Sequence, residues 1–148
     1  YPGYSDYDQH GRVVGPTADV LEQLFKRAGY AYQINLLPIA RVRRGLVSGE
    51  VDVWLGVNNQ VGLEAYVVQS ESSFGALPIH LYYRADGQAV SAMAELDMQP
   101  LPHILVDEPP MRLFVSRSRP DAMAVVRELD RAFESLVAEG VVMDVTRR

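Results

Sequence analysis

Helix-like and strand-like segments alternate at the start of the chain, and this alternation limits the folds open to it. Apolar residues recur at helical spacing over residues 17–28 and again over 40–48. Between these two helices, residues 30–36 alternate large apolar residues with small or polar ones, which predicts a strand. Residues 51–57 form a short apolar run of buried-strand length. Helices and strands that alternate with short links are typical of a parallel α/β sheet.

The second half of the chain is less regular. Residues 79–84 predict a strand, and residues 111–116 predict another. Between them, residues 85–110 contain four prolines, and we expect a connector that holds at most one short helix. Pro120 opens a long helix with an apolar face, and Gly140 ends it.

Composition excludes several classes of protein. The chain has 148 residues, the length of one domain, and 48% of them are hydrophobic, enough for a substantial core. A net charge of -5 argues against nucleic-acid binding, which needs a basic face. The absence of cysteine excludes disulfides and thiolate metal sites. No apolar run is long enough to span a bilayer, and the first residue, Tyr1, is compatible with removal of a leader from a longer precursor.

An ordered set of short motifs resembles the family 3 extracellular solute-binding proteins. The motifs are Tyr1-Pro2-Gly3-Tyr4, a polar turn through Asp8 and Gly11, Gly15 with Asp19, Leu36-Leu37-Pro38, Gly49-Glu50-Val51-Asp52, and the stretch from Tyr66 to Glu71. The stretch from Leu113 to Gly140 looks like the closing strand and long C-terminal helix of that family.

The resemblance implies a fold and a role. The fold is α/β, a three-layer sandwich lobe of the type II periplasmic binding fold, with a mostly parallel sheet flanked by helices. The role is recognition of a small polar solute outside the cytoplasm, in the periplasm of bacteria that have one, for an ABC-type uptake system with a membrane permease. The resemblance implies no cofactor and no catalysis.

Two departures from the family pattern affect this prediction. The family begins with a core strand before the aromatic turn, and the chain begins at Tyr1. The family also has a second lobe between its crossover strands, for which residues 85–110 are too few. We therefore expect residues 1–148 to form a single solute-binding lobe, with residues 1–84 and 111–148 as its core and 85–110 as a connector in place of the second lobe.

The resemblance also implies candidate ligand-binding residues. Tyr1 falls where an aromatic ring stacks on the ligand, and Tyr4 lies beside it. Ile39 takes the place of an aromatic wall. Arg41 can reach an anionic group of the ligand from the start of the second helix, although a surface position explains it better.

The loop after the strand at 51–57 supplies further candidates. Gly56, Asn58 and Asn59 lie where the family binds the polar groups of the ligand, and the amides can both donate and accept. Leu63 occupies a position where members that bind amino acids place an arginine. Because leucine cannot grip a carboxylate, the usual amino-acid clamp is absent at this position.

Three other functions remain open. The same lobe can serve as the ligand-sensing domain of a membrane signalling protein. A dehydratase-like enzyme derived from this fold would need a general acid, for which Glu64 and Asp6 are the nearby candidates. The fourth possibility is a structural remnant that binds no ligand.

In a single lobe we expect weak solute affinity, or a partner chain that covers the open cleft. A homodimer would pair the otherwise unpaired edge of the sheet. The three histidines share no metal-ligand spacing.

Overall fold

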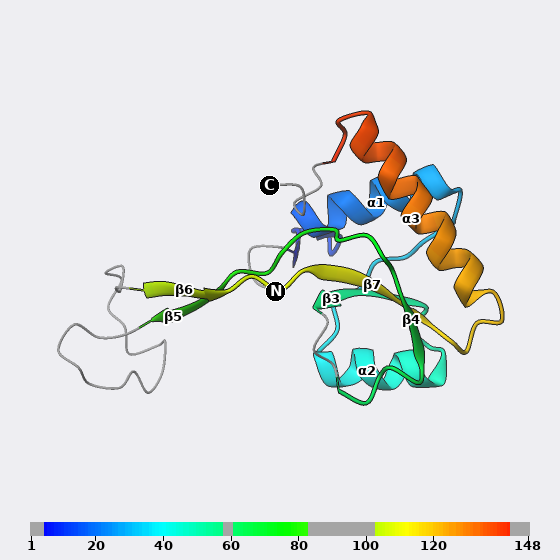
Figure 1. Cartoon of the computed structure of the whole chain (residues 1–148), viewed down its shortest axis with the longest axis horizontal. Helices are drawn as coiled ribbons and strands as arrows, with labels where there is room; N and C mark the ends of the chain where they lie inside the picture. The colour runs from blue at the N-terminus through cyan, green and yellow to red at the C-terminus, as the bar shows by residue number, and fades with distance from the viewer. Residues whose placement is uncertain (1–4, 58–60, 83–102, 143–148) are drawn as a thin grey trace.

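The computed structural model describes residues 5–57, 61–82 and 103–142. Its elements in chain order are β1 (Asp6–Tyr7), β2 (Val13–Val14), α1 (Pro16–Ala28), α2 (Ile39–Ser48), β3 (Val53–Val57), β4 (Val67–Gln69), β5 (Ile79–Tyr82), β6 (His103–Asp107), β7 (Met111–Ser116) and α3 (Ala122–Ala138). Figure 1 shows β3, β4 and β7 between helices α1 and α3 on one side and α2 on the other, with β5 and β6 projecting away. The predicted α/β fold class is confirmed.

The central sheet has the strand order β3-β7-β4. Trp54 of β3 lies opposite Phe114 of β7, and Val68 of β4 lies opposite Val115, both in antiparallel register. Strands β3 and β4 therefore run in the same direction but are not neighbours, because β7 returns between them. The mostly parallel sheet expected from the sequence is wrong for the pairs that the structure describes.

The two faces of this sheet bury different side chains. Leu113 and Val115 of β7 pack in one core cluster with Leu129 and other residues of α3. Phe114, between them in sequence, packs instead with Leu46 of α2. This alternation is the two-residue period of a strand, and each large apolar side chain that is fully buried stabilises the fold by about 1.5–3 kcal/mol. The three-layer arrangement is confirmed.

The predicted helices are present. The first begins at Pro16, and Gly15 occupies its N-cap position with φ of 121°. Gly29 and Gly49 end α1 and α2 in the left-handed conformation. The apolar face expected for the C-terminal helix is buried, and it consists of Ala122, Val126, Leu129, Phe133 and Leu136.

Residues 30–36, predicted as a strand, form no strand. The nearest strand on that side is β3, whose only ladder in the described part of the chain is with β7. Without a neighbour at bonding distance, the alternating pattern of this segment does not lead to a ladder, and the prediction is wrong. Tyr30 N instead donates to Phe25 O at 3.0 Å, which closes the end of α1.

The segment predicted as a connector with at most one short helix contains a strand instead. Within residues 85–110, His103–Asp107 is strand β6 and pairs antiparallel with β5, with Leu81 opposite Ile104. The run of aliphatic residues at 104–106 favours a strand, and the prolines that follow stand outside it. Residues 83–102 lie outside the described ranges.

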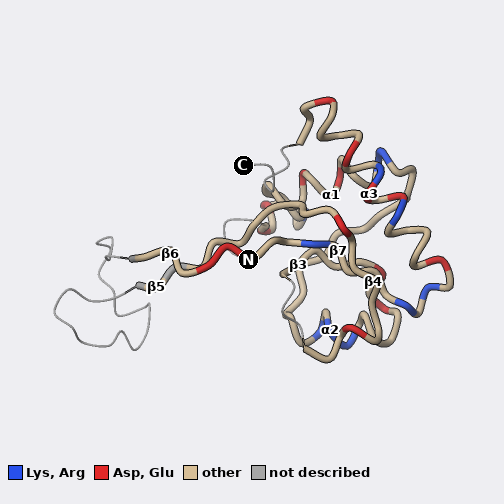
Figure 2. Tube along the Cα trace, viewed as in Figure 1, with Lys and Arg blue, Asp and Glu red and all other residues tan. Residues whose placement is uncertain are grey.

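Charged side chains lie mostly on the helices and loops, and β3 and β4 carry none (Figure 2). None of the described helices is long and apolar enough to cross a membrane.

Candidate functional site

Three elements converge at one end of the lobe. Helix α1 begins at Pro16, α2 begins at Ile39, and β3 ends at Val57, and these three points lie at the same end of the central sheet. Neither helix has a side-chain hydrogen bond at its N-cap. The first N–H groups of both helices therefore point towards this end with a partial positive charge, an arrangement that favours polar or anionic groups.

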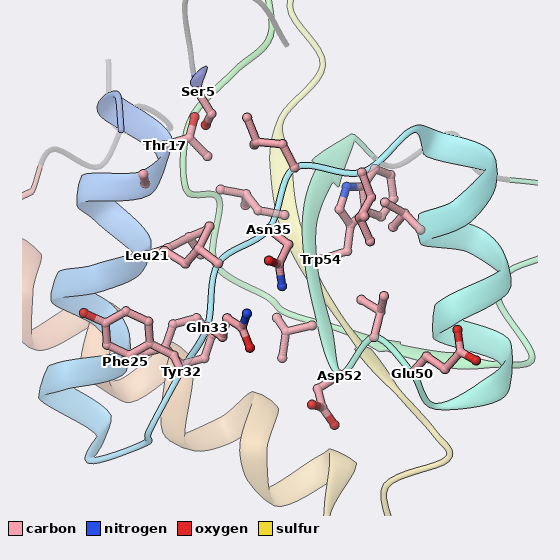
Figure 3. Close-up of a pocket in the computed structure, with 18 of the residues that line it drawn as sticks. Ser5, Thr17, Leu21, Phe25, Tyr32, Gln33, Asn35, Glu50, Asp52 and Trp54 are labelled. Carbon is pink, nitrogen blue, oxygen red and sulfur yellow. The ribbon is translucent and has the colours of Figure 1, made fainter. Parts of the chain in front are cut away.

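A pocket of about 680 Å³ opens beside this end and runs along β3 (Figure 3). It lies between α1, residues 31–37, α2 and β3. Ser5 and Thr17 stand at one end of it, and Glu50 and Asp52 stand at the other. We call the end at Ser5, Thr17 and Ile39 the mouth, and the part along β3 the channel. The volume lies within the range of small-molecule sites, roughly 300–1,000 Å³.

The walls of the channel are largely apolar. Ala18, Leu21 and Phe25 line it from α1, and Val42 lines it from α2. The ring of Phe25 stacks on Tyr32 at a centroid distance of 5.8 Å, which holds residues 31–37 against α1.

Polar side chains interrupt these walls at few places. The amides of Gln33 and Asn35 lie in the middle of the pocket, and the hydroxyls of Ser5 and Thr17 lie at its mouth. Each of these groups can both donate and accept a hydrogen bond. A small polar molecule can therefore be held by a few directed bonds against apolar walls.

The strand pair β1–β2 fixes the position of residues 31–37 from the outside. The Tyr7 hydroxyl accepts a hydrogen bond from Leu36 N at 3.2 Å and lies 3.4 Å from Leu36 O, to which it can donate. Asp8 in the following turn accepts from His10 N at 2.8 Å and from Arg12 N at 2.9 Å. The backbone N–H of Arg12 holds the pKa of the Asp8 carboxyl below its usual value.

Two of the predicted ligand-binding residues lie at or beside the pocket. Ile39 lines the mouth with 47% of its surface exposed. Gly56 is buried in β3, and the ring of Trp54, which lines the pocket, lies over it.

The remaining candidates lie elsewhere. Arg41 is exposed on α2 and does not line the pocket. Leu63 is only 3% exposed and packs in the core with Val42, Leu46, Val67 and Phe114. Tyr1, Tyr4, Asn58 and Asn59 lie outside the described residues.

Sequence reasoning missed Ser5, Thr17, Gln33 and Asn35 as pocket residues. The two amides occupy alternate positions in a segment that was interpreted as a strand. Two carboxamides at i and i+2 in an otherwise apolar segment were the available signal. This signal was missed because the predicted strand assigned both amides to a face of the sheet.

The two candidates for a general acid lie outside the pocket. The carboxylate of Glu64 accepts from Gly62 N at 2.8 Å, and that of Asp6 accepts from Tyr7 N at 2.8 Å. Both residues are exposed, and neither lines the pocket. Within residues 5–57, 61–82 and 103–142, no group of three metal-ligating side chains gathers.

No protein-family model matches the sequence, and no curated protein matches it either. Solved structures do match the fold. One is a periplasmic His/Glu/Gln/Arg/opine family-binding protein from Silicibacter pomeroyi in complex with lysine, with a TM-score of 0.68 and 15% identity, covering 95% of this chain and 88% of that one. Another is the arginine-, lysine-, histidine-binding protein ArtJ from Geobacillus stearothermophilus, with a TM-score of 0.65 and 14% identity, covering 95% and 87%.

A third similar structure is a histidine kinase sensor domain with similarity to periplasmic binding proteins. Its TM-score is 0.69 at 11% identity, and the match covers 95% of this chain and 87% of that one. At these identities the likeness concerns the fold.

Proposed function

Because the chain has the type II periplasmic binding fold, which it shares with amino-acid-binding proteins, we propose that it binds a small polar solute and does not act on it chemically. It would do so outside the cytoplasm, in the periplasm where there is one, as the binding lobe of an ABC-type uptake system. The observation that carries the proposal is the convergence of the N-termini of α1 and α2 and the carboxyl end of β3 at the mouth of the pocket. Ligands of open α/β sheets bind at such ends.

The proposed contacts with the solute are made by the groups that line the mouth. Thr17 and Ser5 supply hydroxyls, the first N–H groups of the two helices supply fixed donors, and Ile39 supplies an aliphatic wall. Three further groups of candidates are carried over from the family resemblance. They are Tyr1 and Tyr4 as stacking rings, Gly56, Asn58 and Asn59 as the loop that contacts polar groups, and Arg41 as a partner for an anionic group.

The position of Leu63 narrows the class of solute. Its side chain is buried under α2, so an arginine-type fork at this position is absent from the mouth. The carboxylate of an amino acid would then depend on the helix N-termini, which bind anions less strongly than a bidentate guanidinium. The proposal therefore favours a polar solute that does not need this clamp.

We also propose that residues 1–148 act as a single lobe, with residues 85–110 as connector between the core parts 1–84 and 111–148. A single lobe covers a ligand from one side only, so contact area and exclusion of water are reduced. Affinity should be weak unless a permease, a second copy or another chain covers the mouth.

The experiment is a thermal-shift screen of the protein with amino acids, polyamines, sugars and organic acids, because a ligand of the native state raises the melting temperature. A hit is then titrated against Thr17→Val, which removes the mouth hydroxyl at nearly constant volume. The matched control is Gln23→Ala, because Gln23 is an exposed residue of α1 away from the pocket.

Weaker binding by Thr17→Val and unchanged binding by Gln23→Ala would support the mouth as the site. Equal binding by both variants would reject it. No shift with any compound, at millimolar concentration, would reject solute binding by the lobe alone.

One observation favours a second candidate function, that of a ligand-sensing domain, since a histidine kinase sensor domain has a similar fold. The two functions differ in their genetic setting. A membrane-spanning helix and an output domain encoded in the same gene would favour sensing, and a separate gene beside permease genes would favour uptake.

A further inference from the structure

Strands β5 and β6 form a two-stranded ribbon that projects away from the three layers (Figure 1). They pair with each other, and in the described part of the chain neither pairs with another strand. Both lie inside the chain, between β4 and β7. We call the pair the ribbon, its end at Ile79 and Asp107 the base, and its other end the tip. Two strands alone are marginally stable in water, so a ribbon of this kind gains from cover over one face.

One face of the ribbon is aliphatic. Leu81 and Ile104 are direct partners in the ladder, so their side chains share a face. Ile79, two residues before Leu81, lies on the same face. The exposed fractions are 56% for Leu81, 53% for Ile104 and 43% for Ile79. Leu105, the neighbour of Ile104 in β6, points to the opposite face.

This aliphatic face lies outside the packed layers. The described helices pack against β2, β3, β4, β7 and one another, not against the ribbon. Three neighbouring aliphatic residues, each about half exposed, form an apolar patch on the order of 300 Å², a size that often marks an interaction site on a soluble domain. The patch therefore calls for a partner with an apolar surface of its own.

The edges of the ribbon are less suited to association than this face. The ladder shifts register between Ile79 and His80, where β6 has one residue more than β5. An extra residue of this kind bends and twists the strand, which protects its edge from open-ended pairing with other strands. We therefore expect contact through the face, which is complete once a single partner covers it.

Charge indicates which partner fits and in which direction. Asp107, opposite Ile79 at the base, is the charged residue that the ladder places on this face among the described residues. An identical aliphatic face is therefore complementary to it. Two ribbons that point in opposite directions keep their Asp107 side chains at opposite ends, whereas two that point the same way bring these like charges together. The opposed arrangement has twofold symmetry and closes after two copies.

We propose that the aliphatic face of the ribbon, made by Ile79, Leu81 and Ile104, is the contact surface for a second copy of the chain. The two ribbons pack face to face and point in opposite directions. Two such patches bury about 600 Å² in total, which is less than the roughly 1,000 Å² of a stable interface, so the dimer is weak and reversible. None of the three residues lines the pocket, so this inference does not rest on solute binding.

The test is sedimentation equilibrium of the whole chain, from about 10 µM to about 1 mM, a range that covers weak complexes. We expect a reversible equilibrium between monomer and dimer. Leu81→Glu places a charge in the middle of the contact surface and should raise the dimer Kd at least about tenfold, because the carboxylate would be desolvated without a partner. Leu105→Glu is the matched control, since Leu105 is 51% exposed on the opposite face, and it should leave the Kd unchanged.

A second measurement uses the unmodified chain and so does not depend on the folding of any variant. The methyl resonances of Leu81 and Ile104 should shift on dilution in step with the fraction of dimer. Those of Leu105, on the opposite face, should stay in place.

A monomer over the whole concentration range would overturn the inference. It would also be overturned by a dimer that Leu81→Glu leaves intact, or that Leu105→Glu weakens to the same extent. Growth beyond the dimer into larger assemblies would overturn the closed twofold arrangement. A dimer that behaves as expected, in a chain that binds no solute, would reject only the proposed function.

Discussion

The indole ring of Trp54 lies over Gly56, two residues further along β3. A methyl group on Gly56 would lie 2.1 Å from Cζ2 of that ring, well inside contact distance. Residues i and i+2 of a strand share a face, and on this face the Trp54 ring also stacks on Phe114 at a centroid distance of 5.2 Å. The glycine is thus explained by the packing of a tryptophan, independently of any ligand.

We expect Gly56→Ala to destabilise the protein by about 1–3 kcal/mol, because it overpacks the face of the sheet that α2 covers. Denaturant unfolding measures the effect. Trp54→Phe removes the ring atoms that the new methyl group meets, so in its background the same change should cost much less. Equal costs in both backgrounds would show that this contact is not the cause.

Ser116 makes a second prediction possible. Its hydroxyl is fully buried and donates to Leu46 O at 2.6 Å, which connects β7 to the end of α2. Ser116→Ala leaves this carbonyl without that partner and should destabilise the fold by about 1–3 kcal/mol. Ser118, whose hydroxyl lies 3.2 Å from Val47 O on the surface, is the control. A cost for Ser118→Ala as large as that for Ser116→Ala would contradict the role of burial.

Tyr30 should lose its proton only at high pH. Its hydroxyl donates to Glu128, and this bond raises its pKa to about 12. Because the pKa is raised in the folded state, the stabilisation is complete below the ordinary value of 10.0 and is lost as pH rises towards 12. Ultraviolet titration of the phenolate should show a late step that Tyr30→Phe removes and that Glu128→Gln moves to lower pH.

The ion pair between Arg27 and Glu139, at 2.7 Å, predicts an effect at acid pH. The side-chain hydrogen bond from Arg27 lowers the pKa of Glu139 below its ordinary value of 4.5. A lowered pKa contributes stability above the ordinary value, and this is lost as pH falls through the folded-state pKa. Glu139→Gln should therefore be less stable than the parent at pH 7 and equal to it near pH 2. Added salt should reduce the difference, since both side chains are partly exposed.

The sequence predicted the helices and their buried faces well, because these depend on local spacing and on glycine at positions such as Gly29 and Gly49. The sequence did not predict the register of the sheet. Nothing local indicates that β7 inserts between β3 and β4, since pairs such as Val57 with Met111 join distant parts of the chain. The strand predicted at residues 30–36 failed for the same reason: a strand needs a neighbour, and its own pattern cannot supply one.

The candidate site was predictable to a smaller degree. Ile39 was found because the resemblance placed it after a Leu-x-Pro turn at the start of a helix. Thr17 and Asn35 were missed because their role depends on α1 and residues 31–37 lying across a pocket from β3. Leu63 was assigned to the ligand by position in a motif, but its side chain points into the core under α2.

The central place of β7 has a consequence for synthesis. Strands β3 and β4 leave the ribosome well before β7, and their shared neighbour in the sheet does not yet exist at that point. Contacts between distant segments form slowly, since the entropy of closing a long loop must first be overcome. The nascent chain therefore carries two unpaired apolar strands until Ser116 has emerged, and exposed strands of this kind are prone to aggregation.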